Sequence, residues 1–377
     1  MKRRIALLAA ATAVAVTACG SSSKNTTPTT AAQPGGTTAA APSTNLNIGN
    51  PAKAVTLTES GSSLLYPYLQ ELVSPLTAAY SNITLTPAAG GSGKGISDAS
   101  SDTSQLGGSD AYLSPGQTAK DPSLLNIPIV VSGQAVNYNL PGVSNLKLSG
   151  DVLAQMYEGK ITKWNDPTIG ALNSGVTLPA TSVVPVRRVD SSGDTFIFTS
   201  FLSKTNSAWN NGPAFGTTVT WPAVSGELTA SGNPGMVQTC KATPGCVSYV
   251  GVSSESASQQ ARLGEAMLKN ASGNYLLPTA ATETAAASAA APSVPDNLAA
   301  PVIDEPGAQS YPIVNFEYLI LKSSQADADT SKAVRTLLSF AIDPSQGSSS
   351  QYLTKEDFVP LPASVAIKVK AAIAKIS

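Results

Sequence analysis

Histidine is absent from all 377 residues of the chain. Its absence excludes the Ser-His-Asp and Cys-His classes of hydrolase and zinc sites with histidine ligands. Charge is scarce as well: charged residues make up 12% of the chain, whereas soluble proteins average roughly 25%. The formal net charge of −1 gives no basic surface of the kind that nucleic acids need. We therefore expect no nucleic-acid partner. Of the hydrolytic mechanisms considered, hydrolysis by carboxyl groups alone is still possible.

Cysteine is rare too, with three in the chain, and the first of them ends an export signal. A basic start, KRR at 2–4, precedes an apolar stretch at 5–16, which is shorter than the roughly 20 residues of a membrane-spanning helix. The segment VTAC at 16–19 resembles a bacterial lipobox, in which Cys19 is acylated, for example with palmitate, and becomes the mature N-terminus. We expect a lipoprotein signal peptide at 1–18; an ordinary secretory signal with an incidental cysteine is the alternative.

Residues 19–45 are rich in Ser, Thr, Pro and Ala, and they lack the apolar side chains that a core needs. They are typical of a flexible tether, which would hold the protein by its lipid on the extracytoplasmic face of the cell membrane. Export also bears on Cys240 and Cys246, which flank the turn-prone sequence KATPG. In an oxidising compartment we expect them to form a disulfide, with two free thiols as the alternative.

The rest of the chain alternates between strand and helix patterns, which predicts an α/β fold with helices on both faces of a sheet. Strands are expected at 55–58, 83–86, 106–110, 127–131, 135–138, 183–186, 246–250 and 311–320. Helices are expected at 64–80, 96–104, 149–157, 195–202 and 330–341, with another near the end of the chain. The alanine-rich segment 278–300 fits a helix followed by a loop, and the sequence does not decide its structure.

Four loops share glycines, small hydroxyl side chains and, in one case, an arginine: 61–64, 91–93, 108–110 and 188–195. In open α/β sheets such loops gather at the carboxyl ends of strands, where ligands bind. Glycine lets the backbone approach closely, and helix N-termini offer free N–H groups. Each loop alone is commonplace turn chemistry, but together with Arg188 they predict a site for a small oxyanion.

Asp110 and Asp194 sit in these loops, although a carboxylate repels an anion. At about 4 Å and an effective dielectric constant of about 20, two like charges repel by about 4 kcal/mol. The two aspartates fit a ligand that carries protons, because an O–H of phosphate can donate to a carboxylate. Sulfate has no such proton, so the aspartates would discriminate against it. Asp190 is interpreted as a solvated turn residue, and Arg187 as a structural or surface residue.

Several motifs resemble those of the phosphate-binding proteins (PstS) of bacterial ABC phosphate importers, most closely the lipid-anchored actinobacterial type. They include "GSSLLYP", "GGSGKGI", "GGSDAYLS", "YEGKITKWNDP" and "VVPVRRVDSSGDTFIFTSFLSK". The resemblance implies a type II periplasmic-binding-protein fold, with two α/β lobes, a two-strand hinge and the ligand in the cleft. Lobe I would comprise 46–138 plus 310–377, and lobe II 139–309.

The resemblance also implies the ligand contacts, which by motif fall on Ser63, Leu64, Ser92, Asp110, Arg188, Ser192, Gly193, Asp194 and Thr195. Many relatives have Thr-Phe in place of Ser63-Leu64, and Thr in place of Asp194. The implied function is capture of inorganic phosphate outside the cytoplasm and its delivery to an ABC permease. The resemblance also implies a monomer that is not an enzyme and that has no cofactor or metal. The alternatives are an extracellular phosphohydrolase, with Asp110 or Asp194 as nucleophile or base, and a binding protein for another oxyanion, such as sulfate or molybdate.

Overall fold

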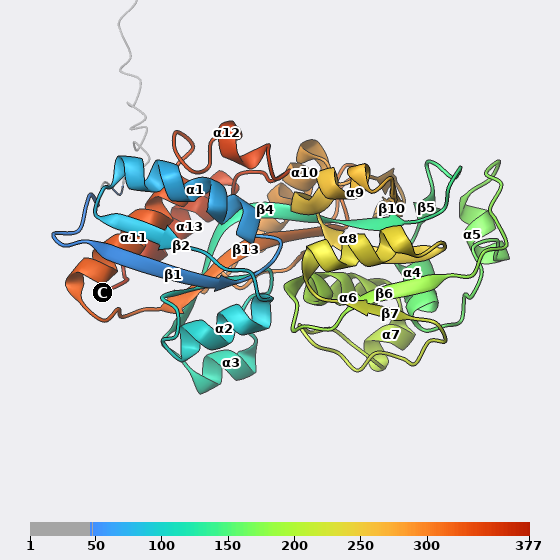
Figure 1. The fold of residues 1–377 in the computed structure, drawn as a ribbon, viewed down its shortest axis with the longest axis horizontal. Helices are drawn as coiled ribbons and strands as arrows, with labels where there is room; N and C mark the ends of the chain where they lie inside the picture. The colour runs from blue at the N-terminus through green and yellow to red at the C-terminus, as the bar shows by residue number, and fades with distance from the viewer. Residues whose placement is uncertain (1–45, 47) are drawn as a thin grey trace, which may run out of the picture. The chain divides into compact units, whose positions relative to one another are not determined.

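A computed structural model describes Leu46 and residues 48–377 of the chain (Figure 1). The predicted signal peptide at 1–18, the predicted lipidation site Cys19 and the tether at 19–45 lie outside the described residues. Within residues 48–377, no helix has both the length and the apolar character that crossing a membrane requires.

The centre of the fold is a mixed sheet of two parallel groups of strands joined by two long antiparallel strands (Figure 1). Along the sheet the order is β2-β1-β3-β13-β4-β8-β6-β7. β1 pairs in parallel with β2 and β3, and β6 pairs in parallel with β7 and β8. Their bounds are β1 Val55–Gly61, β2 Ile83–Thr86, β3 Leu106–Ser109, β4 Leu124–Tyr138, β6 Val184–Arg188, β7 Leu228–Ala230, β8 Cys246–Gly251 and β13 Ile313–Lys322. The predicted α/β class is confirmed.

β4 belongs to both parallel groups. Its first part pairs with β13 as far as Gly133, and its last part pairs with β8 from Gln134 onward. The prediction of two strands at 127–131 and 135–138 was therefore wrong, because one strand of 15 residues runs through both. Gly133 makes this possible: a side chain there would collide with the carboxyl of Glu283 and with Pro278.

Helices cover the sheet. The larger ones are α1 Tyr66–Ala79, α2 Ser92–Ser100, α4 Gly150–Tyr157, α6 Gly193–Thr205, α8 Gly232–Ala242, α10 Ala280–Ala290, α11 Ala328–Ile342 and α13 Ala363–Ile373. α8 was not predicted, and the others overlap segments where a helix was predicted or left open. α2 and α6 begin earlier than expected, at residues that the sequence had assigned to ligand loops. α10 settles the alanine-rich segment, where a capping box between Thr279 and Thr282 starts the helix.

Short elements complete the described chain. The helices are α3 Pro115–Lys120, α5 Pro167–Leu172, α7 Ser207–Asn211, α9 Glu255–Gln260 and α12 Ser350–Leu353, with 3-10 turns at Val252–Ser254 and Ala291–Ser293. The strands are β5 Lys147–Leu148, β9 Gly264–Glu265, β10 Met267–Lys269, β11 Tyr275–Leu276 and β12 Val302–Ile303.

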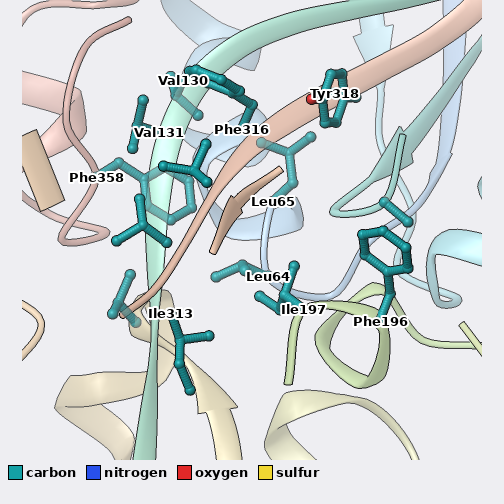
Figure 2. Packing of buried hydrophobic residues seen from close by; sticks show 14 of the residues in the cluster. Leu64, Leu65, Val130, Val131, Phe196, Ile197, Ile313, Phe316, Tyr318 and Phe358 are labelled. Atoms are coloured by element: carbon teal, nitrogen blue, oxygen red, sulfur yellow. The ribbon is translucent and has the colours of Figure 1, made fainter. Parts of the chain in front are cut away.

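The two shared strands pass through the hydrophobic core (Figure 2). Val130 and Val131 of β4 and Phe316 of β13 are fully buried there. Leu64 and Leu65, just before α1, lie in the same cluster (Figure 2). These apolar residues anchor the loop between β1 and α1, so the polar loop residues beside them are held in place.

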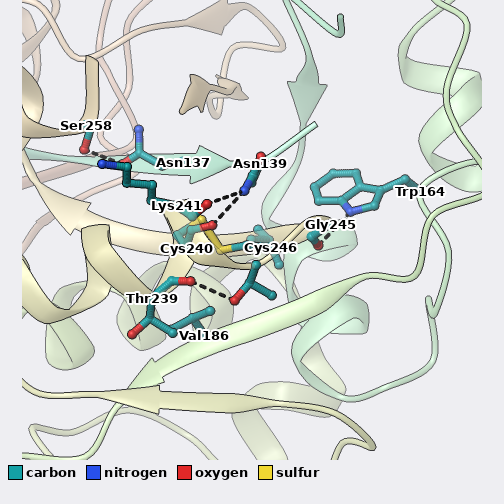
Figure 3. The surroundings of a disulfide bond; sticks show 12 residues. Asn137, Asn139, Trp164, Val186, Thr239, Cys240, Lys241, Gly245, Cys246 and Ser258 are labelled. Carbon is teal, nitrogen blue, oxygen red and sulfur yellow. Dashed lines mark hydrogen bonds between the residues drawn. A yellow bond between two sulfur atoms is a disulfide. The ribbon is translucent and has the colours of Figure 1, made fainter. Parts of the chain in front are cut away.

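The predicted disulfide between Cys240 and Cys246 is confirmed (Figure 3). It joins the last turn of α8 to the first residue of β8. Asn139 donates from its side chain to the carbonyls of Cys240 and Lys241, at 2.9 and 3.0 Å. The disulfide therefore closes the turn between α8 and β8, and Asn139, just after β4, binds the same turn.

Candidate anion-binding site

The four loops singled out in the sequence meet at one place. β1 and β3 are parallel neighbours, so the loops that follow them leave the same edge of the sheet. The first turn of α2 contacts the loop before α6, because Gly93 N–H donates to the carbonyl of Ser191 at 3.0 Å. The loops that the sequence assigned to lobes I and II are thus in direct contact in this structure.

Asp110 directly follows β3 and is 1% exposed. One carboxyl oxygen accepts a hydrogen bond from the hydroxyl of Ser62, and the other accepts one from Ser92 at 3.3 Å. Burial raises the pKa of Asp110, whereas hydrogen bonds from Glu317 and the serines, and the positive charge of Arg188, oppose that rise. Donors on both sides hold the carboxyl in a single orientation.

Arg188 ends β6, and its side chain is 1% exposed. Its guanidinium grips both oxygens of Asp190 and donates from Nη1 to Asp194 at 2.7 Å. Burial lowers the pKa of Arg188, but the two carboxylates outweigh burial and hold it above its ordinary value. Burial alone would raise the pKa of Asp190, but Arg188 more than offsets burial, so the pKa of Asp190 is lowered. Arg188 and Asp190 therefore form an ion pair in which the positive charge is already balanced.

Asp194 is the second residue of α6 and is 1% exposed. Besides the bond from Arg188, it accepts one at 3.1 Å from the side chain of Gln134 in β4. Burial, and then the negative charge of Asp110, raise the pKa of Asp194 to about 7, against the opposing effects of Arg188 and Gln134. This carboxyl can therefore exchange a proton near neutral pH.

Two helices begin at the site. The hydroxyl of Ser192 caps α6 by accepting from the N–H of Thr195 at 3.3 Å, which leaves the N–H groups of Gly193 and Asp194 without intrahelical acceptors. α2 begins at Ser92. A side chain on Gly193 would collide with the Ser92 hydroxyl, so glycine is needed for the two helix starts to approach. Both positive helix ends favour a negatively charged ligand.

Three of the predicted contacts have their polar groups committed to protein partners in this structure. The Thr195 hydroxyl is 2.7 Å from that of Tyr249. The Ser63 hydroxyl accepts from a backbone N–H at the start of α8, at 3.2 Å. The N–H of Leu64 donates to Ser62 at 3.0 Å, and its side chain lies in the core (Figure 2).

Sequence reasoning missed three residues of the site. The expectation that Asp190 is a solvated turn residue was wrong: its side chain is 16% exposed and neutralises Arg188. Ser62 holds Asp110. Glu317, in the middle of β13, is fully buried, and the register of β13 with β3 sets it beside Asp110. The signal for Glu317 was available, because it is the one charged residue in the apolar run Tyr311–Leu321.

Arg187 differs from its neighbour, as the sequence interpretation expected. It pairs with Glu227 at 2.8 Å and lies over the ring of Trp221, with about a quarter of its side chain exposed. Within residues 46 and 48–377, no cluster of three His, Cys, Asp or Glu side chains is arranged to hold a metal ion.

Comparison with known proteins agrees with this geometry. The profile of the PBP superfamily domain matches residues 24–345. The phosphate-binding protein PstS of Pasteurella multocida is 32% identical, over 85% of this chain and 90% of its own length. Phosphate-binding protein PstS 2 of Mycobacterium tuberculosis is also 32% identical, over 85% of this chain and 87% of its own.

Among solved structures, a high-affinity periplasmic phosphate-binding protein with bound phosphate superposes with a TM-score of 0.67 at 25% identity, covering 84% of this chain and 93% of its own. A phosphate-binding protein from Stenotrophomonas maltophilia superposes with a TM-score of 0.65 at 22% identity, over 84% of this chain and 94% of its own, and supports the fold. Profile, relatives and structures agree, and the chain belongs to the PstS family of phosphate-binding proteins within the PBP superfamily.

Proposed function

We propose that this protein binds inorganic phosphate between the loops of β1, β3 and β6 and delivers it to an ABC-type permease. The observation that carries the proposal is the convergence of Asp110, Arg188 and Asp194 with two helix N-termini at one buried place. The names of the relatives, all phosphate-binding proteins, support it.

The proposed ligand contacts combine three kinds of group. Donors to the oxyanion would be the hydroxyls, the N–H groups of the helix starts and the guanidinium. Acceptors for its protons would be the two carboxyls. The proposed set is Ser63, Leu64, Ser92, Asp110, Arg188, Ser192, Gly193, Asp194 and Thr195. Because Asp190 already balances Arg188, most of the attraction would come from hydrogen-bond donors and helix dipoles rather than from a free positive charge.

Discrimination against sulfate would come from the carboxyls. An ionised Asp110 accepts a hydrogen bond from a phosphate O–H. Facing sulfate, the same carboxylate would remain unpaired beside a dianion, which is costly in a buried site.

Access to the buried site would require the two halves of the sheet to separate. We propose two lobes, 46–138 plus 310–377 and 139–309, that move about β4 and β13. The change of partner in β4 between Gly133 and Gln134 supports a hinge near that position. Opening would break the Gly93–Ser191 contact, and ligand bound between the lobes would favour closure.

The location outside the cytoplasm and the lipid anchor at Cys19 form a separate part of the proposal. The internal disulfide supports an oxidising compartment. Mass spectrometry of the protein from membranes tests the anchor: an acylated Cys19 as first residue supports it, and an unmodified N-terminus refutes it.

We also propose that the protein binds phosphate without hydrolysing phosphate esters. Asp110, the first candidate nucleophile, has both oxygens engaged by serine hydroxyls. Incubation with an aryl phosphate tests this point; we expect no release of phosphate above that of buffer.

The decisive experiment is calorimetric titration of the purified, phosphate-free protein with phosphate and then with sulfate. Tight phosphate binding without a sulfate response is the expected result. Binding of both anions would remove the role given to the carboxyls, and binding of neither would refute the site.

A further inference from the structure

Glu317 is placed opposite Asp110 by the sheet register. Tyr318 of β13 pairs with Ser109 of β3 in an antiparallel ladder. The next position along therefore sets Glu317 across from Asp110, and side chains directly opposite in such a ladder point to the same face. Glu317 is 0% exposed and Asp110 is 1% exposed.

One oxygen of Glu317 is held by two donors. Its Oε1 accepts from the hydroxyl of Ser132 at 2.6 Å and from the side chain of Asn315 at 3.1 Å. Among the described residues, Oε2 meets no N–H or hydroxyl donor. The register leaves the carboxyl of Asp110 as the neighbour with which the Glu317 carboxyl can share a proton.

A hydrogen bond between two carboxyl groups requires a proton on one of them. Asp110 already accepts from Ser62 and Ser92, and both bonds favour its ionised form. Burial raises the pKa of both carboxyls. At Asp110 the two serines and the positive charge of Arg188 oppose the rise, whereas at Glu317 the negative charge of Asp110 adds to it, and the pKa of Glu317 lies well above the ordinary value.

We infer that Glu317 is a positioning residue that carries the shared proton and donates it to Asp110, so that Asp110 remains an ionised acceptor for the phosphate O–H. This inference rests on the proposed phosphate site and adds a residue outside the proposed contact set. Glu317 and its two donors lie on β13 and β4, the strands that pass between the halves of the sheet. The acceptor of the site is therefore set by the hinge strands rather than by a mobile loop.

Other ionisable groups face this pair. Arg188 and Asp194 from the β6–α6 segment act on Asp110, with opposite signs. Asp190 is bound to Arg188, and Tyr318 lies beside Glu317 in β13. These groups are common to wild type and to Glu317 variants, so a difference between the proteins reports on Glu317.

Two substitutions of Glu317 distinguish the effect of its hydrogen-bond donor from the effect of its negative charge. Glu317→Gln keeps an N–H donor toward Asp110 and a carbonyl oxygen toward Ser132, so we expect phosphate affinity within about threefold of wild type. Glu317→Leu fills the space without a donor, so the pKa of Asp110 rises. As pH falls, Asp110 then takes up a proton, loses its role as acceptor and offers a donor to sulfate. Between about pH 8 and pH 6, we expect the phosphate-over-sulfate affinity ratio to fall at least about tenfold further than in wild type.

Glu283→Gln is the matched control, because Glu283 is another fully buried carboxyl that lies outside the site. It should bind both anions as wild type does. If Glu317→Gln loses as much selectivity as Glu317→Leu, the charge of Glu317 matters and the inference is wrong. A wild-type ratio in a folded Glu317→Leu protein would also overturn it.

Infrared spectra of the phosphate-free protein test the proton without any ligand. At about pH 8, wild type should show a protonated-carboxyl band that Glu317→Gln removes, and an unchanged spectrum would mean that Glu317 is ionised. This measurement stands even if Glu317→Leu does not fold. If wild type fails to bind phosphate, the proposed function fails, whereas the protonation state of Glu317 is still decided.

Discussion

Two groups of buried carboxyls differ in what surrounds them. The site carboxyls, Asp110 and Asp194, lie beside Arg188 and accept hydrogen bonds from hydroxyl and amide donors. The interior carboxyls are Glu283 of α10, which packs against Gly133 of β4, and the partly buried Glu265 of β9, which pairs with Asn137 at the end of β4. Within the described residues, no cation is among the groups that shift the pKa of either one, so the comparison shows the effect of partners.

Glu283 is the extreme case. It is 0% exposed, and within the described part of the chain neither carboxyl oxygen has a hydrogen-bond donor. Burial raises its pKa well above the ordinary value, and the charges of Asp357 and Glu265 add to the effect. Burial, followed by the charges of Glu255 and Asp357, raises the pKa of Glu265 to about 8.

The difference shows that burial favours the neutral form of a carboxyl and that a neighbouring cation opposes this effect. Beside Arg188, the half-buried Asp190 has a lowered pKa, whereas burial without a cation raises the pKa of Glu283 well above its ordinary value. Asp194 lies between these cases, with a pKa of about 7. A site that recognises a proton on its ligand needs carboxyls in which burial is partly offset by a cation. The interior carboxyls have no such offset.

Removing the positive charge of Arg188 should have the largest effect on the site carboxyls. Arg188→Met leaves the buried Asp194 and the half-buried Asp190 without their cation, so we expect about 3–5 kcal/mol of lost stability, together with loss of phosphate binding. Denaturant unfolding and calorimetry measure the two effects. Arg187→Ala is the control, since that ion pair is partly exposed, and it should cost about 1 kcal/mol or less. Normal phosphate binding by a folded Arg188→Met protein would show that the site is assigned wrongly.

Glu283→Gln should make the interior group insensitive to pH. The folded state keeps a proton that the unfolded chain releases above a pKa of about 4.5, so wild-type stability falls as pH rises above that value. Each such group contributes up to about 1.4 kcal/mol per pH unit, and the neutral amide removes this contribution. Unfolding free energies at several pH values measure the slope. An equal slope in Glu283→Gln and wild type would contradict the prediction.

Asp110→Asn tests whether a site carboxyl discriminates phosphate from sulfate. An amide can still accept a hydrogen bond from phosphate, but it can also donate to an unprotonated oxygen. We expect phosphate affinity to fall by about tenfold or less and sulfate affinity to rise by at least about tenfold. Titration with both anions measures the ratio, and unchanged rejection of sulfate would refute the role given to Asp110.

Asp194 predicts a smaller effect of pH on binding. Because binding places phosphate beside a carboxyl whose pKa is already about 7, the complex should take up a proton that Asp194 and phosphate share. Phosphate affinity should therefore hold or rise, by up to about tenfold per unit, as pH falls from about 8 to 6. Asp194→Asn should flatten the profile. A wild-type affinity that falls sharply below pH 7 would count against this assignment.

Much of the fold could be predicted from the sequence, because local patterns specify local structure. Alternating apolar residues marked β1 and β2, and the motif after β6 marked the start of α6 to within two residues. The disulfide followed from two cysteines around a short turn. The single strand β4 could not be predicted, because Ser132 and Gly133 look like a break until Glu283 is seen packed over them.

The residues that meet at the site could be recognised in the sequence, since the glycines, serines, Asp110 and Arg188 all belong to local motifs. How their charges are balanced became visible only in the folded protein. Asp190 closes on Arg188, Gln134 reaches Asp194 from another strand, and Glu317 faces Asp110 only through the register of β13 with β3. The physical reason is that protonation depends on burial and on neighbours distant in sequence, which no local pattern contains.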